Sequence, residues 1–207
     1  MNTATSETPE PAREPSAIER MNRQRAKRIR TYRERPEAAK IVDGARTHQT
    51  RYAPTDPFHA ELEVGLGYDG DNLSVGVHRA LGGLHDLPNP GDILCAALAA
   101  CTDSTLRQIA GQLKVHIERL SVTVKGDIDV RGTLCVSTDV PVGFQQMRIM
   151  VDLELAKDTN PRHREKLMAA TEYCCVVLQT LRTGVPISMT LTDAAGEPAE
   201  ASEASQE

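Results

Sequence analysis

Alternating apolar positions in the middle of the chain predict β-strands. In Phe58–Gly65 and Leu73–His78 every second residue is apolar, and the glycine-rich stretch GYDGDN between them predicts a hairpin. Longer alternations run through Arg119–Arg131 and through Met147–Leu155. The segment Pro186–Thr192 predicts a short final strand, because proline is tolerated at the start or edge of a sheet.

Two apolar segments predict helices. The first, Pro90–Leu113, begins with proline where a missing N–H costs little, and its first half, ILCAALAAC, is apolar on every side. The second, Pro161–Arg182, has an apolar later half, CCVVLQTL, and Gly184 is a natural C-terminal stop. The order of strands, helix, strands, helix and strand predicts an α+β fold with both helices buried.

A basic segment precedes this domain. Ser16–Arg35 predicts a helix with Ser16 as its cap and Glu19 at capping-box spacing, and nine Lys or Arg side chains lie between Arg20 and Lys40. A thin apolar stripe on this helix would dock on the domain or on a second subunit; the alternative is an arm that binds nucleic acid or an acidic partner. We therefore divide the chain into a disordered tail (1–15), a basic helical extension (16–44), the main domain (45–193) and a disordered acidic tail (194–207).

Composition and charge narrow the classes of function. A chain of 207 residues with 40% hydrophobic residues can bury one core, and its net charge of −5 and lack of Trp argue against a nucleic-acid-binding protein. The longest uncharged apolar stretch, Ile93–Thr102, is too short to span a bilayer, and the N-terminus has no apolar leader. We therefore expect a cytoplasmic protein whose five cysteines are thiols, and the absence of a CxxC motif argues against a metal site.

Three cysteines lie in the apolar parts of the predicted helices. Cys101 ends the apolar stretch of the first helix, and Cys174 and Cys175 lie in the second, so Cys101 could meet one of them if the helices pack together. Such a pair could form a redox centre; alternatively, all three are simply buried core residues. We expect Cys95 and Cys135 to fill the core.

The cysteine segments resemble those of a known family. The stretch NPGDILCAALAAC, Asn89–Cys101, resembles the first active-site segment of the OsmC/Ohr family, in which Asn-Pro is followed by Glu and an Ala-rich helix that ends in the reactive Cys. The stretch EYCCVVLQTL resembles the family's second helix in the register that aligns Cys175 with the second cysteine, with Val176 in place of the usual Pro. The similarity extends over roughly Phe58–Thr192.

This resemblance implies a specific architecture and chemistry. The fold would be an intertwined homodimer in which curved antiparallel sheets wrap two buried central helices. The activity would be thiol-dependent hydroperoxide reduction in oxidative-stress defence, with Cys101 as the peroxidatic thiolate and Cys175 as the resolving thiol. No cofactor or metal would take part, and an external dithiol, in some members a dihydrolipoyl protein, would reduce the disulfide.

Two family residues are missing. The family's Glu after Asn-Pro is replaced by Gly91, with Asp92 next, and the hairpin segment GLGYDGDN lacks the family's Arg. A buried thiol without a cationic neighbour has a raised pKa and reacts slowly, so we expect Arg79, just before the active-site segment, to supply this charge within the subunit or across the dimer. His78, His85 and Asp103 are weaker candidates.

Two rival functions follow from these departures. The first is a non-enzymatic member of the fold that binds a small apolar ligand in the dimer cleft, which the missing Arg and Glu favour. The second is an interaction module led by the basic helix. The two intact cysteines favour the enzyme.

Overall fold

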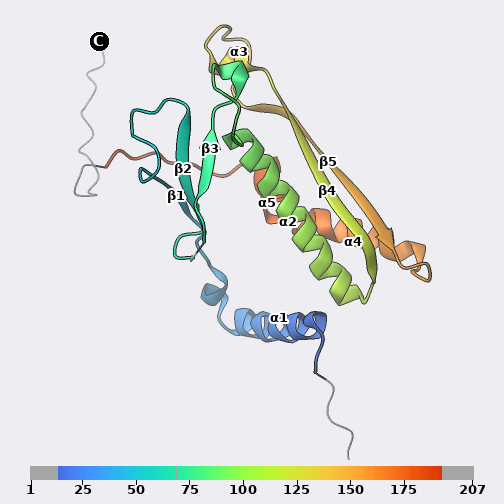
Figure 1. Ribbon diagram of the computed structural model, residues 1–207. Helices are drawn as coiled ribbons and strands as arrows, with labels where there is room; N and C mark the ends of the chain where they lie inside the picture. Colours follow the sequence, from blue (N-terminus) through green and yellow to red (C-terminus); the bar gives the residue numbers. More distant parts are fainter. Residues whose placement is uncertain (1–13, 69, 193–207) are drawn as a thin grey trace, which may run out of the picture.

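The computed structural model describes residues 14–68 and 70–192 (Figure 1). Two separate antiparallel sheets flank a long central helix, and a basic helix lies at one end. The predicted α+β class is confirmed. The expected tails, 1–15 and 194–207, lie outside the described residues except for positions 14 and 15.

The first sheet contains the predicted hairpin and one additional strand. Strand β2 (His59–Val64) pairs antiparallel with β3 (Leu73–Gly76), which confirms the hairpin. Strand β1 (Ala45–His48) pairs with the other edge of β2 and was not predicted from its sequence, ARTH, which has no apolar alternation. Glu63 stabilises this pairing, because its carboxylate forms an ion pair with Arg46 Nε at 2.6 Å and a hydrogen bond with His48 Nε2 at 2.7 Å.

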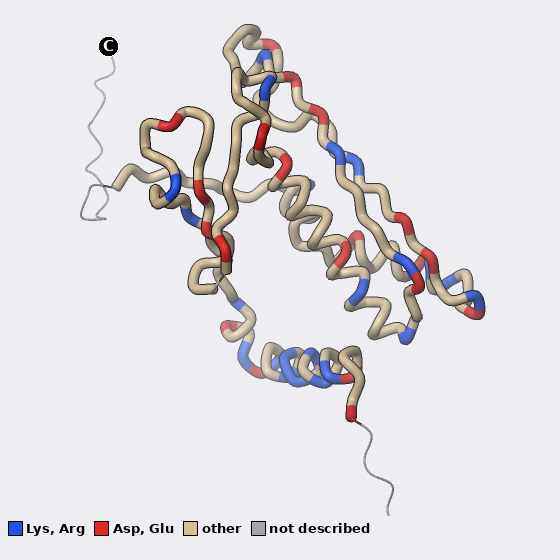
Figure 2. Tube along the Cα trace, in the orientation of Figure 1, with Lys and Arg blue, Asp and Glu red and all other residues tan. Residues whose placement is uncertain are grey.

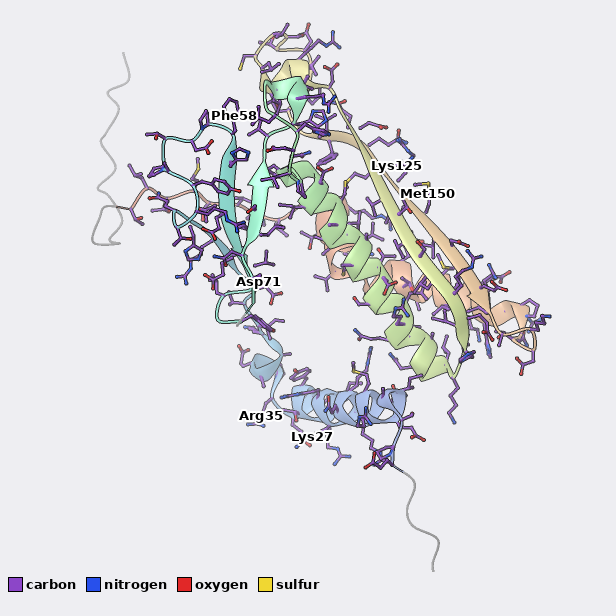
Figure 3. All side chains as sticks on the ribbon, in the orientation of Figure 1. Lys27, Arg35, Phe58, Asp71, Lys125 and Met150 are labelled. Carbon is purple, nitrogen blue, oxygen red and sulfur yellow. The ribbon has the colours of Figure 1, made fainter. Side chains whose placement is uncertain are left out.

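The second sheet is a long two-stranded ribbon. Strands β4 (Ile117–Ile128) and β5 (Phe144–Leu155) confirm the two predicted strands, and they pair with each other along their length. The strand predicted over Arg119–Arg131 ends at Ile128, earlier than expected, because Val130–Thr133 forms the short helix α3. Alternate side chains face α2, whereas those of Lys125 and Met150 lie on the exposed face (Figure 3).

The central helix begins and ends as predicted. Helix α2 (Pro90–Leu113) starts with a capping box, in which the Asn89 side chain accepts from the Gly91 and Asp92 amides and the Asp92 carboxylate accepts from the Asn89 amide. Its C-terminal half packs on β4 and α4. The core there consists of Leu106, Ile109, Ala110, Val115, Leu153 and Leu167.

The expectation that α2 is buried on all sides is wrong for a single chain. Its Ala-rich first half has Ala96, Ala97 and Ala100 exposed. The reason is geometric: the ribbon and the C-terminal helices cover only part of this helix, so these small side chains stay exposed among the described residues.

The predicted second helix consists of two helices. Helix α4 (Pro161–Cys174) and helix α5 (Val176–Thr183) are separated at Cys175, whose backbone is extended with φ −73° and ψ 107°. Helical periodicity continues through the break, so sequence pattern gave no sign of it.

The predicted final strand does not form over 186–191. Only Thr192 makes an isolated bridge, and the exposed fractions of Ile187 and Met189 reach 89% and 97%. A strand needs a neighbouring strand for its hydrogen bonds, and within the described residues this segment has none.

The basic extension is helical, as predicted. Helix α1 (Ala17–Glu34) has the expected Ser16–Glu19 capping box and is followed by the short helix η1 (Pro36–Ala39). It contacts the C-terminal end of α2, where Asn22 Nδ2 donates to the Gly111 carbonyl at 3.1 Å and Ile18 lies against Gly111. Basic residues crowd along the helix (Figure 2).

One histidine joins the first sheet to the loop that leads into α2. His59 Nε2 lies 3.1 Å from Asp86 Oδ2, His59 Nδ1 lies 3.2 Å from Asp56 Oδ2, and the ring stacks on Tyr52. Hydrogen bonds to Asp86 and Asp56 raise the pKa of His59.

These contacts predict a pH-dependent contribution to stability. A raised folded-state pKa means that protonated His59 stabilises the fold below its unfolded pKa of about 6.5, and that this stabilisation is lost as pH rises through the folded pKa. We expect His59→Gln to lower the free energy of unfolding more at pH 5.5 than at pH 9, measured by urea denaturation. An equal loss at both pH values would contradict the proposed charge interaction.

Candidate active site

The structure brings Cys101 and Cys175 together. Cys101 lies on α2, and Cys175 lies at the break between α4 and α5, where these helices contact α2. The two thiols are hydrogen-bonding neighbours, and Thr102 Oγ1 lies 3.7 Å from Cys175 Sγ. Cys175 is fully buried, whereas Cys101 is half-buried.

The surroundings of Cys101 favour its thiolate. Burial is the largest single influence and raises its pKa, but hydrogen bonds from the Val177 amide, the Cys175 thiol, the Thr105 hydroxyl and the Val176 amide outweigh burial. The net pKa of Cys101 is therefore below that of an ordinary cysteine. Amides at the start of a helix stabilise an anion through their N–H groups and the helix dipole.

The surroundings of Cys175 favour its neutral thiol. Burial raises the pKa of Cys175 most, and its interactions with Cys101 raise it further, against the lowering effects of the Leu178 amide and Thr102. One thiol of the pair is thus inclined to ionise and the other to keep its proton, and the neutral thiol can donate to the thiolate.

The other three cysteines have different surroundings. Cys174 is exposed at the end of α4. Cys95 is half-buried near the start of α2, and burial together with Asp92 raises its pKa. The expectation that Cys135 fills the core is wrong, because it is exposed in a turn with a left-handed φ of 55°.

The charged and histidine residues considered as partners of Cys101 make other contacts within one chain. Arg79 is exposed in the short helix η2 (Arg79–Leu81) and is not among the leading influences on the Cys101 pKa. Asp92 belongs to the cap of α2, and Asp103 pairs with Arg107 at 2.6 Å. His78 caps η2 and packs edge-on against His85. A catalytic role for Arg79 stays a prediction.

A cavity of about 720 Å³ adjoins Cys175. Its walls come from α2, β5, α4 and α5 and are mainly apolar, formed by residues such as Leu98, Met147, Ile149, Val151 and Leu178. The Glu172–Arg182 ion pair, at 2.8 Å, contributes polar groups to the same cavity. The cavity can therefore accept a molecule with an apolar body beside Cys175, the thiol that contacts Cys101.

Two classes of site are not seen in the described part of the chain. Over 14–68 and 70–192, no three metal-ligating side chains gather in one place. No helix among these residues is both long and apolar enough to cross a membrane.

Sequence reasoning missed the groups that act on Cys101. The amides of Val176 and Val177 carry no side-chain signature, and they face Cys101 only because the helix breaks at Cys175. The Thr105 hydroxyl lies one helical turn after Cys101 and could have been suggested by its i, i+4 spacing.

Two solved structures share this fold, and a third is a weaker match. An OsmC-like protein from Mycoplasma pneumoniae matches with a TM-score of 0.55 and 13% identity, over 70% of this chain and 90% of that one. An OsmC-like protein of unknown function from Vibrio cholerae matches with a TM-score of 0.55 and 11% identity, over 68% and 94%. An organic hydroperoxide resistance protein OsmC from Legionella pneumophila gives a TM-score of 0.48 and 24% identity, over 71% and 93%.

The family model gives the clearest relationship. No curated protein matches the sequence. The model of the OsmC-like protein family matches residues 83–190, which is more than half of the 207 residues and includes both Cys101 and Cys175. This chain therefore belongs to the OsmC-like protein family.

Proposed function

We propose that this protein is a thiol-dependent hydroperoxide reductase in which Cys101 is the peroxidatic thiolate and Cys175 the resolving thiol. The observation that carries the proposal is the contact between two thiols whose pKa values are shifted in opposite directions, that of Cys101 down and that of Cys175 up. A thiolate is the nucleophile in peroxide reduction, and a neighbouring thiol is needed to resolve the product.

The proposed reaction has three balanced steps. The Cys101 thiolate attacks one peroxide oxygen and breaks the O–O bond, which gives a sulfenic acid and an alkoxide that leaves as the alcohol after taking a proton. The Cys175 thiol then attacks the Cys101 sulfur, forming a disulfide and releasing water. An external dithiol reduces this disulfide and is itself oxidised to a disulfide.

The cavity beside Cys175 supports an alkyl hydroperoxide as the substrate. Its apolar walls can accept a hydrocarbon chain, and the Glu172–Arg182 pair offers polar contacts nearby. The dithiol chemistry and the free cysteines suit a reducing compartment, so we propose that the protein acts in the cytoplasm.

Disulfide mapping tests the proposed function. One equivalent of an alkyl hydroperoxide should oxidise the wild-type protein to a Cys101–Cys175 disulfide, detected by peptide mass spectrometry. One equivalent of alcohol should be released, which is quantified separately. Cys101→Ser should abolish alcohol formation, whereas the matched control Cys135→Ser should retain it, because Cys135 is exposed and distant in the chain. A dominant Cys174–Cys175 bond, or no oxidation of Cys101, would refute the assignment.

A non-enzymatic ligand-binding role is the second candidate. A cleft of about 1470 Å³ lies between the first sheet, β4 and the start of α2, with apolar walls that include Val75, Val122, Ala96 and Ala99. A protein that binds an apolar ligand there, and leaves peroxide unchanged in the experiment above, would support this alternative.

We also propose that the working unit is a homodimer. The uncovered Ala96, Ala97 and Ala100 face of α2 and the exposed apolar segment 185–191 both support it, because each leaves apolar surface that a second copy could bury. The role predicted for Arg79 at Cys101 would then be exercised across the dimer.

Light scattering tests the assembly. We expect a mass of twice 22.6 kDa at micromolar concentration. Ala100→Glu, which places a charge on the uncovered face of α2, should shift the protein towards monomer or aggregate, whereas Gln112→Glu at the exposed far end of the helix should not. A stable, folded wild-type monomer would rule the proposal out.

A further inference from the structure

The helix break at Cys175 changes where the backbone hydrogen bonds go. The last α4 bond runs from the Cys175 amide to the Thr171 carbonyl at 3.0 Å, and the first α5 bond runs from the Gln179 amide to the Cys175 carbonyl at 3.0 Å. The amides of Val176, Val177 and Leu178 lie between these two bonds. They form the first turn of α5, whose N–H groups have no carbonyl within their own helix.

A side chain holds the break in place. In an unbroken helix the Val176 amide would donate to the Glu172 carbonyl, four residues earlier. In the structure that carbonyl accepts from Gln179 Nε2 at 2.8 Å. Gln179 therefore occupies the acceptor that Val176 would otherwise use, and it connects the end of α4 to the first turn of α5.

The released amides face the reactive sulfur. Val176 and Val177 both direct their N–H groups to Cys101, although the Val176 side chain itself is 71% exposed. The strongest stabilising groups around Cys101 are these amides, a hydroxyl and a thiol, with no cation among them. The main chain thus does here what a cationic side chain does at many reactive cysteines.

We propose that the Val176 and Val177 amides form the anion-binding cradle of the Cys101 thiolate, and that Gln179 is the positioning residue that keeps this cradle open. The proposal rests on the proposed function only in taking Cys101 as the reactive thiol. It assigns a role to Val176 that its side chain does not reveal: the residue contributes an N–H.

The substitution Val176→Pro removes this N–H with little other change. Proline is favoured at the first position of a helix, and the residue before it must be extended, as Cys175 already is. Val176→Ala is the matched control, because it shortens an exposed side chain and keeps the amide.

The rate of Cys101 alkylation by iodoacetamide, followed by peptide mass spectrometry from pH 5 to 10, gives the thiol pKa without any peroxide. At pH 7, Val176→Pro should slow alkylation by roughly tenfold, about one pKa unit, with the two curves converging at high pH. Val176→Ala should follow the wild type. A Val176→Pro curve that coincides with that of the wild type would overturn the cradle.

Gln179→Leu tests the positioning role independently. It removes the donor to the Glu172 carbonyl and should also raise the Cys101 pKa, whereas Glu172→Gln, which breaks the Arg182 ion pair but keeps the carbonyl, should not. A Gln179→Leu profile identical to that of the wild type would remove Gln179 from the proposal.

A measurement on the unaltered main chain covers the case in which Val176→Pro fails to fold. The ¹⁵N amide resonances of Val176 and Val177 should shift with the Cys101 titration and lose that response in Cys101→Ser; resonances that ignore the titration would overturn the cradle. Failure of the proposed function gives a different result. If the Cys101 pKa is low and depends on residue 176 but the protein reduces no peroxide, the cradle is supported and the reductase activity is refuted.

Discussion

The interruption of the last helical segment at Cys175 is the constraint on which the site depends. A continuous helix from Pro161 to Thr183 would use the Val176 and Val177 amides for its own hydrogen bonds, and none would remain for a neighbouring sulfur. The extended backbone at Cys175 divides this helix into α4 and α5. It creates a new helix N-terminus beside the half-buried thiol of α2.

The same break explains why the pKa values of the two contacting thiols, Cys101 and Cys175, are shifted in opposite directions. Both cysteines lose hydration on folding, which by itself would raise both pKa values. Cys101 receives two amide N–H groups and the Cys175 thiol as donors, whereas Cys175, at the turn itself, lies next to the developing charge of Cys101. The backbone geometry therefore assigns the thiolate to α2 and the proton to Cys175.

Much of the scaffold could be predicted from sequence because it follows local rules. Alternation around a glycine-rich turn predicted the β2–β3 hairpin. Alternation also predicted the strands β4 and β5, although not their pairing, and the proline start predicted α2. Strand β1 was missed because its polar residues pair through Glu63 rather than through an apolar face. The segment 186–191 was assigned wrongly, because alternation shows only that a strand is possible and cannot supply a neighbour.

Only part of the candidate site could be predicted from the sequence. The cysteine pair could be anticipated from two apolar helices and from the family resemblance. The groups that activate the Cys101 thiol could not be predicted, because every residue except proline has a backbone N–H, which leaves no mark in the sequence. The replacement of the family's usual Pro by Val at position 176 was visible, but its meaning depended on knowing that the chain breaks immediately before it.

We propose that Cys101 is the thiolate that reacts first and that Cys175 is the thiol that follows. The most direct measurement uses Cys175→Ser, in which the first oxidation product has no resolving partner. After one equivalent of alkyl hydroperoxide, a sulfenic-acid-specific nucleophile such as dimedone should label Cys101 in this variant, and labelling should be absent from wild-type protein that has formed its disulfide. Labelling of another cysteine, or no labelling with the peroxide left unconsumed, would contradict this order of reaction.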